Sequence, residues 1–234
     1  MNWLDIIIIG IIVFCTLRAY RRGFILSLFS LVSLLLTILL TVQLYPVGSR
    51  LISQHTNIYE SFQSSISNTL NLEEQLSGSQ TLEEQTSLIN NLPLPSTIRE
   101  SLLVNNNREV YDILQVNRLE DYISGYIARI AINILSFIII FLIVYIGLRI
   151  LIRTLDIISK LPVLNSVNKL LGIGFGLILG LIKVWFVFII ITFFSTNGLV
   201  MIVFEKINES SFASALYNNN VLLKIILDLS KNIL

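Results

Sequence analysis

Long runs of apolar residues constrain this chain more than any other feature of its sequence. Hydrophobic residues make up 54% of the 234 residues and charged residues only 13%, whereas soluble domains carry roughly 25% charged residues. Crossing the hydrocarbon core of a bilayer takes roughly 20 apolar residues in a helix. Four segments suit this role, and they are residues 3–17, 24–44, 127–148 and 171–194. The sequence therefore predicts an all-α integral membrane protein with four transmembrane helices.

The first apolar segment is short enough to be compared with a secretory signal peptide. A signal peptide begins with basic residues and ends at a small-residue cleavage site. This chain begins MNWLD, and its arginines follow the apolar run. Trp3 and Tyr20 also suit the two membrane interfaces, where aromatic rings are enriched. We therefore expect this segment to span the membrane.

The basic residues predict how the spans are oriented, because short loops rich in Lys and Arg remain in the cytoplasm. The connections after the first and third spans contain Arg18, Arg21, Arg22, Arg149, Arg153, Lys160 and Lys169. The long segment 46–126 instead contains ten acidic residues and four arginines. Both termini and segment 46–126 are therefore expected outside the cytoplasm.

This orientation divides the chain into four parts. Residues 1–45 form a transmembrane hairpin, and residues 46–126 form an acidic extracytoplasmic helical insertion between the second and third spans. Residues 127–196 contain the last two spans with the cytoplasmic connection 149–170, and residues 197–234 form an extracytoplasmic amphipathic tail. The insertion is either a small helical cap or a loosely ordered segment.

Local patterns predict helices within the insertion. Apolar residues recur at four-residue steps from Ile58 to Leu70, and a second helix is expected from about Thr97 to Tyr126, after two prolines. The sequence Leu-Glu-Glu-Gln occurs at Leu72 and again at Leu82. These paired glutamates are interpreted as a solvated acidic helix face rather than as a carboxylate cluster.

Two further stretches carry a polar stripe at helical spacing. The stripes are Arg149, Arg153, Asp156 and Lys160 after the third span, and Asn220, Lys224, Asp228 and Lys231 in the tail. Helices of this kind either pack against the bundle or lie along the membrane surface. Both alternatives remain open at this stage.

The last span contains a ladder of glycines. Gly172, Gly176 and Gly180 are four residues apart, so they lie along one face of the helix. In lipid, small residues allow the backbones of two helices to approach closely, and this contact is a main source of packing energy. The ladder therefore predicts tight packing of this span on a neighbour in the same chain or in another copy.

Three ionisable residues lie within or beside the spans. Lys183 interrupts the last span, where a cation costs several kcal/mol unless its stem reaches water. It is a candidate functional residue that faces a partner inside the bundle, and the alternative is a lysine that reaches interfacial water. Asp5 and Arg129 are expected at similar depth near the outer interface, either paired with each other or each solvated.

Several classes of catalytic site lack the residues that they need. Cys15 is the only cysteine and His55 the only histidine, so neither a disulfide nor a multi-histidine metal site can form within the chain. No phosphate-binding loop motif is present, and the basic residues are too scattered to form a nucleic-acid surface. We therefore expect no enzyme activity, no cofactor, no metal and no nucleic acid.

Two blocks of sequence resemble the colicin V production protein family. In the first block, Trp3 and Asp5 precede an apolar span, and Arg22 and Gly23 begin the next. In the second block, Gly172, Gly176 and Gly180 match the family's entry to its last span. There Lys169 replaces the family's usual arginine, and Asn168 stands where an aspartate is common.

The resemblance implies a multi-pass protein of the bacterial plasma membrane linked to colicin V production or export, and a family not known as enzymes. Within this family, the leading hypothesis is a protein that acts by helix association. Its partners are the lipid bilayer and either a second copy or other membrane proteins that meet the glycine face. The Arg22-Gly23 turn is expected to close the first hairpin.

Two other functions remain open. The chain could be a subunit of a small oligomeric channel or transporter, with Lys183 lining the path together with Asn133 or Ser136. Segment 46–126 could instead be a binding module that the spans anchor to the membrane.

Overall fold

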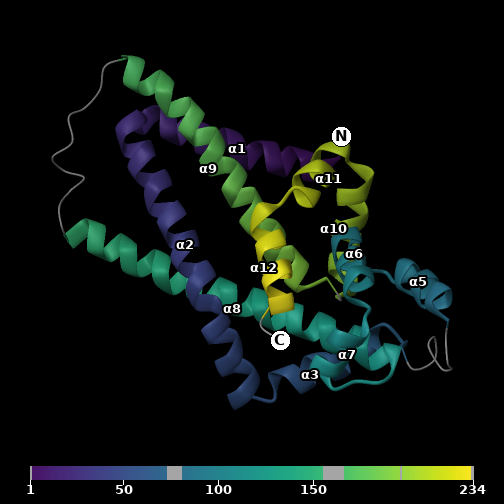
Figure 1. Ribbon diagram of the computed structural model, residues 1–234. Helices are drawn as coiled ribbons and strands as arrows, with labels where there is room; N and C mark the ends of the chain where they lie inside the picture. The colour runs from purple at the N-terminus through teal and green to yellow at the C-terminus, as the bar shows by residue number, and fades with distance from the viewer. Residues whose placement is uncertain (1, 73–80, 155–165, 196, 233–234) are drawn as a thin grey trace. The chain divides into compact units, whose positions relative to one another are not determined.

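The computed structural model describes residues 2–72, 81–154, 166–195 and 197–232. In these ranges every regular element is a helix (Figure 1), which confirms the predicted all-α class. The four longest are α1 (Trp3–Arg22), α2 (Phe24–His55), α8 (Leu119–Thr154) and α9 (Ser166–Phe193). The shorter helices are α3 (Ile58–Thr69), α5 (Leu82–Asn91), α6 (Ser96–Asn105), α7 (Arg108–Leu114), α10 (Gly198–Glu209), α11 (Ser211–Asn218) and α12 (Val221–Asn232).

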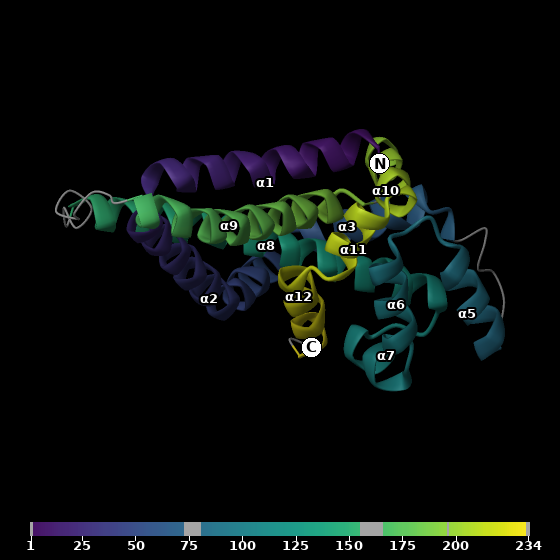
Figure 2. The same cartoon turned by 90° about the horizontal axis from the view of Figure 1, so that it is seen from above.

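Three stretches of helix are long and apolar enough to cross a membrane, namely Trp3–His55, Leu119–Ile150 and Val167–Phe193. The first stretch contains two helices, because α1 ends at Arg22 and is capped by Gly23. This residue has φ 82°, and its N–H bonds the carbonyl of Ala19 at 2.8 Å. Only glycine adopts such a conformation readily. The two helices diverge from this turn (Figure 2), and the count of four spans remains a prediction.

Packing divides the chain into two compact units. Unit 1 contains Met1–Tyr45, Phe137–Ile189 and Lys206–Asn220, and unit 2 contains Pro46–Ser136, Ile190–Glu205 and Val221–Leu234. The long helices α2, α8 and α9 contribute residues to both units. The predicted boundaries at residues 45, 126 and 196 follow the membrane rather than the packing, so they stay predictions.

The helices that contain the second and third spans extend beyond the predicted apolar segments. Helix α2 continues past the expected end at Leu44 and through Pro46 to His55. A proline removes one backbone N–H from the helical ladder, and apolar helices tolerate this loss where neighbouring groups satisfy the freed carbonyl. Helix α8 similarly begins at Leu119, before the expected start at residue 127.

The prediction of one helix from Thr97 to Tyr126 is wrong, because the chain breaks it twice. Helix α6 ends at Asn105, and Asn107 begins α7 with a side-chain oxygen that accepts from the N–H of Val110 at 3.1 Å. Gln115 then ends α7 in the left-handed conformation, with φ 55°. Asparagine favours helix starts over helix interiors, so the run of three asparagines at 105–107 was the signal for the first break.

The second Leu-Glu-Glu-Gln sequence opens α5. Thr81 and Glu84 form a capping box there, in which each side chain accepts from the other residue's backbone N–H. The first copy runs into residues 73–80, which lie outside the described residues. The polar stripe predicted after the third span cannot be followed beyond Arg153, because Asp156 and Lys160 also lie outside the described residues.

The tail stripe is only partly exposed. Lys224 and Asp228 on α12 are exposed, and Leu222, Leu223, Ile226 and Leu227 are buried. Asn220 is fully buried instead of belonging to the polar surface, and its amide donates to the carbonyl of Trp185 at 2.9 Å. The apolar face of α12 is thus covered by protein, as the packing alternative predicted.

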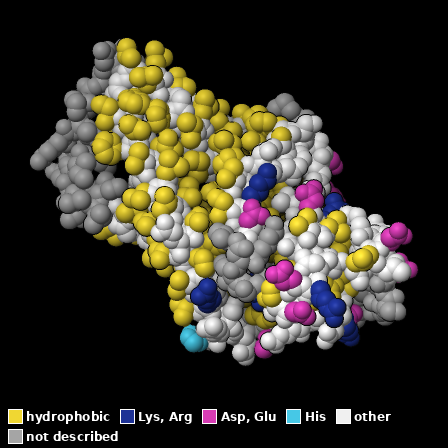
Figure 3. Space-filling model, viewed as in Figure 1, with side chains coloured by type: hydrophobic (Ala, Val, Ile, Leu, Met, Phe, Trp, Pro, Cys, Tyr) yellow, Lys and Arg dark blue, Asp and Glu magenta, His cyan; other side chains and the backbone are white. Residues whose placement is uncertain are grey.

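Hydrophobic and charged side chains gather on different helices at the surface. Figure 3 shows hydrophobic side chains over α2 and α9, whereas charged side chains gather over α5 and α7. On α2 the exposed apolar residues include Val32, Leu35 and Leu39. Exposed apolar surface of this extent is typical of a membrane or partner contact, which agrees with the predicted lipid-facing helices.

Buried tyrosines hold α6 against the start of α8 in unit 2. The Tyr122 hydroxyl donates to the carbonyl of Leu102 at 2.7 Å, and Asn105 donates to the Tyr126 hydroxyl at 2.9 Å. The ring of Tyr111 on α7 stacks on that of Tyr122, with their centroids 4.9 Å apart. Among the described residues the buried Tyr111 hydroxyl has no hydrogen-bond partner, and burial raises its pKa to about 12.

These two stacked tyrosines give a matched pair of substitutions. Tyr122→Phe leaves the Leu102 carbonyl unsatisfied, so we expect the free energy of unfolding to fall by about 1–3 kcal/mol. Tyr111→Phe removes a hydroxyl that makes no bond, so stability is expected to be unchanged or higher. Thermal unfolding of the purified protein in detergent measures both, and equal effects of the two substitutions would contradict the hydrogen bond of Tyr122.

Candidate functional site: the glycine interface and its basic cavity

The glycine ladder of α9 packs against α1 of the same chain. Gly172, Gly176 and Gly180 are buried, and the two helices run side by side in Figure 2. A Cβ atom added at Gly172 would lie 2.7 Å from the Ala19 carbonyl oxygen, and one at Gly180 would lie 2.9 Å from the Cα of Ile12. Rising numbers on α9 meet falling numbers on α1, so the two helices are antiparallel.

The middle glycine makes the closest approach. A Cβ added at Gly176 would lie 2.6 Å from the Cα of Thr16 and 2.8 Å from the Cβ of Ala19. Backbone atoms are the obstacle, so the site cannot accept a side chain by moving a flexible group. Gly174 is exposed, and nothing lies within 4 Å of a Cβ added there. The predicted face is therefore the contact face.

The partner surface on α1 has its own small residues. Cys15, Ala19 and Gly23 are spaced four apart, and all three are buried. They contact the glycine ladder, so small residues meet small residues along the interface. The sequence contains this second ladder, and its spacing was the signal for the partner helix.

The Gly23 turn is fixed from α9. The side-chain oxygen of Asn168 accepts from the backbone N–H of Ile25 at 3.2 Å, which caps the first turn of α2. The Ser27 hydroxyl donates to the carbonyl of Ala19 at 3.3 Å. The cap needs only an oxygen acceptor, so asparagine can replace the aspartate that is common here in the family that the sequence resembles.

Lys183 lies on α9 beside this interface and is exposed in the absence of a membrane. Its ammonium lies 3.5 Å from the sulfur of Cys15 on α1. In an α-helix the side chains tilt toward the N-terminus, so the stem of Lys183 is directed toward the end of α9 that carries Lys169. Asn133, its expected neighbour in a channel, belongs to unit 2 and bonds the Ser49 hydroxyl at 2.5 Å.

A cavity of about 180 Å³ gathers the basic residues of unit 1. Arg18 and Arg22 of α1, Arg149 of α8 and Lys183 of α9 all line it. These residues are separated by up to 165 positions in the sequence, and only folding brings them together. Of the other topology residues, Arg21 is exposed at the end of α1 and Lys169 is half-buried, whereas the Arg153 side chain and Lys160 lie outside the described residues.

Asp5 anchors the start of α1 to the tail. Its carboxylate accepts from the backbone N–H of Asn2 at 2.8 Å and from the hydroxyl of Ser210, and the side chain is buried. The same hydroxyl caps α11, because it accepts from the N–H of Ala213 at 3.0 Å. Asn2 adds a bond from its amide to the carbonyl of Lys206 at 2.6 Å. This arrangement gives Asp5 a structural role.

Arg129 has a different partner, the hydroxyl of Tyr59 on α3. The Tyr59 hydroxyl lies against α8 at Gly125, where an added Cβ would lie 2.9 Å from it. Burial raises the pKa of Tyr59, and the neighbouring Arg129 opposes this rise. Asp5 and Arg129 thus each bond a residue of their own unit. No periodic pattern in the sequence indicates Tyr59 as the partner of Arg129.

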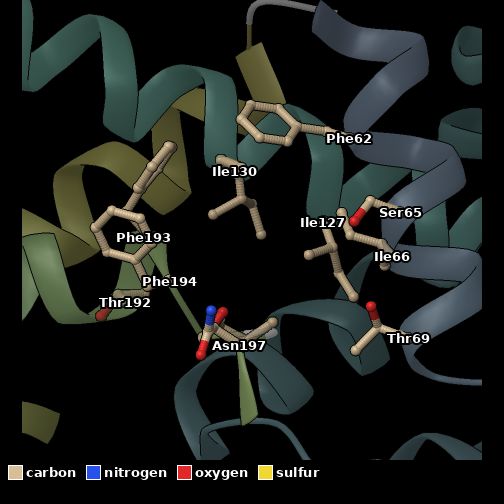
Figure 4. Close-up of a pocket in the computed structure, with 13 residues that line it drawn as sticks. Phe62, Ser65, Ile66, Thr69, Ile127, Ile130, Thr192, Phe193, Phe194 and Asn197 are labelled. Carbon is tan, nitrogen blue, oxygen red and sulfur yellow. The ribbon is translucent and has the colours of Figure 1, made fainter. Parts of the chain in front are cut away.

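Unit 2 contains a second, uncharged cavity of about 370 Å³. Phe62 of α3 and Phe193 of α9 meet edge to face at its wall, with ring centroids 5.9 Å apart. Figure 4 shows Ile127 and Ile130 of α8 at the same space, with Asn197 at its rim. An apolar wall with a few polar groups is typical of a site for a small amphipathic molecule.

Alanine at the two neighbouring glycines separates packing from helix propensity. Gly174→Ala is expected to raise the free energy of unfolding by about 0.5–1 kcal/mol, because alanine favours the helix. Gly176→Ala gains the same propensity but places a methyl group against the backbone of α1, which costs about 1–3 kcal/mol. Thermal unfolding in detergent compares them, and equal shifts would contradict the packing role of Gly176.

The comparisons with known proteins agree with the architecture. A family model described as colicin V production protein matches residues 4–74 and 114–220. These ranges include α1, α2, α8 and α9 with both small-residue ladders, and they omit the part of the insertion that contains α5 and α6. No curated protein and no solved structure matches the chain. The chain belongs to the colicin V production protein family.

Proposed function

We propose that this protein is a non-enzymatic, four-span protein of the bacterial plasma membrane that supports production or export of a colicin V-type toxin and wider envelope functions. The observation that carries the proposal is the α1–α9 interface. In this interface the glycine face of α9 is covered by α1 of the same chain. Association with a second copy or another membrane protein would therefore involve the remaining apolar surfaces of the long helices.

Three features support the membrane arrangement. Helix α1 has 20 residues, which is about 30 Å of helix and enough for one crossing. Gly23 then ends α1 and permits a second crossing by α2. Arg18, Arg22 and Arg149 meet at one cavity, as expected if the ends of α1 and α8 reach the same cytoplasmic surface. Both termini would then lie outside the cytoplasm.

The family relationship supports the process. The match covers both parts of unit 1 that form the glycine interface, so the shared architecture is the part expected to carry the family's role. The partner is a membrane protein or a second copy that contacts the exposed apolar residues of α1 or α2. Segment 46–126 adds an acidic surface outside the membrane.

A deletion strain tests the process directly. Removing the gene from a host that makes a colicin V-type peptide is expected to lower the amount of released peptide. The wild-type gene and a Gly174→Leu variant should restore release, whereas Gly176→Leu should not, because leucine cannot fit against Thr16. Peptide in the medium is measured by activity and immunoblot, with the membrane content of each variant as control. Normal release in the deletion strain would overturn the proposed role.

A subunit of a small channel or transporter is the second candidate. The observation that favours it is the exposed ammonium of Lys183 at the wall of a cavity. Water in a conduction path would reach this residue, whereas lipid or a closed interface would exclude water from it.

Cysteine labelling distinguishes the two candidates and tests the orientation. In a Cys15→Ser background, Arg21→Cys should react with a membrane-impermeant maleimide only in inside-out vesicles, and Asn218→Cys only in spheroplasts. Lys183→Cys should stay unreactive from both sides if the protein acts by association. Labelling of residue 183 as fast as residue 21 would instead support the channel, and exchanged sides for residues 21 and 218 would refute the proposed topology.

A further inference from the structure

The cavity beside the glycine interface contains more positive charge than the described chain balances. Arg18, Arg22, Arg149 and Lys183 line a space of about 180 Å³. The ion pairs found among the described residues involve Arg118 and Lys206, neither of which lines this cavity. The described part of the chain therefore supplies no carboxylate partner to these four cations.

The cations also repel one another. Arg22 lies within electrostatic reach of both Arg18 and Arg149. Like charges at such distances are costly where the local dielectric is below that of water. An anion between them would remove the repulsion and would add charge-assisted hydrogen bonds, which are the strongest available to arginine.

The remaining lining residues narrow the kind of anion. Ser27 and Ser30 of α2 and Tyr145 of α8 place hydroxyl groups on the wall, and Leu34 and Leu179 supply its apolar part. Ser27 and Ser30 donate to the carbonyls of Ala19 and Leu26. The arginine forks and the Tyr145 hydroxyl are therefore the donors that match the oxygens of a phosphate group. A space of this size holds a phosphate group.

The surroundings favour a lipid as the source of this phosphate. Arg22 lies at the end of α1, and Cys15 lies seven residues deeper, which is about 10 Å along the helix axis. The cavity therefore extends from the expected headgroup level into the span, and the exposed apolar residues Phe14 and Leu17 lie on the same stretch of α1. Basic pockets between membrane helices on the cytoplasmic side are typical sites for anionic headgroups.

We propose that this cavity binds the headgroup phosphate of an anionic phospholipid, with Arg18, Arg22 and Arg149 at the phosphate and Lys183 at its deeper side. The site rests on the proposed membrane position of unit 1 and is independent of the role in toxin production. The bound lipid would bridge α1, α8 and α9, so it would stabilise the same unit that the glycine interface holds.

Thermal unfolding of the full-length protein in detergent tests the site, with added phosphatidylglycerol, phosphatidylcholine or inorganic phosphate as separate probes. We expect phosphatidylglycerol to raise the unfolding temperature of the wild type, and the other two probes to raise it much less. Arg22→Gln and Lys183→Gln should each weaken the apparent affinity for phosphatidylglycerol by about tenfold, because each removes a charged contact.

Arg21→Gln is the matched control, because it removes one charge from the same helix end but does not line the cavity. Its lipid response should equal that of the wild type. Equal losses in all three variants would show a nonspecific surface effect and would overturn the site. A response to inorganic phosphate as large as that to phosphatidylglycerol would overturn the lipid as its source. If a glutamine variant does not fold, native mass spectrometry of the lipid retained by the wild-type protein replaces it. Retained phosphatidylglycerol would support the site, and phosphatidylcholine retained equally well would overturn it.

Discussion

The close contact between the backbones of α1 and α9 is the interaction on which unit 1 depends. Apolar side chains gain little by leaving lipid for each other, so the helices need surfaces that fit at short range. Glycines on α9 and small residues on α1 provide such surfaces over three successive turns. The same contact brings Lys183 of α9 beside the arginines at the end of α1.

Polar groups then fix what the ladders leave free. Asn168 holds the turn at one end of the interface, and Asp5 with Ser210 holds the tail at the other. These side chains also accept from backbone N–H groups at helix starts. The same side chains therefore cap helices and join distant parts of the chain. The basic cavity differs from them, because its cations have no acidic partner in the described part of the chain.

Periodicity in the sequence was enough to predict the helical class, the long apolar helices and the contact face of α9. Which helix packs against α9 was harder to predict, because the spacing of Gly172, Gly176 and Gly180 defines one face of α9 but not the helix that covers it. The helix that covers this face is α1, which contacts it through Cys15 and Ala19. The small size of these two residues is the sequence feature that indicates α1 as the partner. The bond from Arg129 to Tyr59 and the meeting of Arg22 with Arg149 depend on three-dimensional packing, and spacing along one helix cannot predict them. The break at Asn105–Asn107 is predictable from its residues, because asparagine favours helix ends.

The separation of the two ladders along the chain has a consequence for how the protein is made. Thr16 meets Gly176, so about 160 residues are translated between the two partners, which takes roughly 10–30 s at ordinary rates of synthesis. In the proposed topology, α1 and α2 reside in the bilayer without α9 during that interval, while the acidic insertion is carried across. The first hairpin therefore has to be stable in lipid on its own, and a factor that shields Cys15, Ala19 and Gly23 from premature neighbours would act only before the last helix arrives.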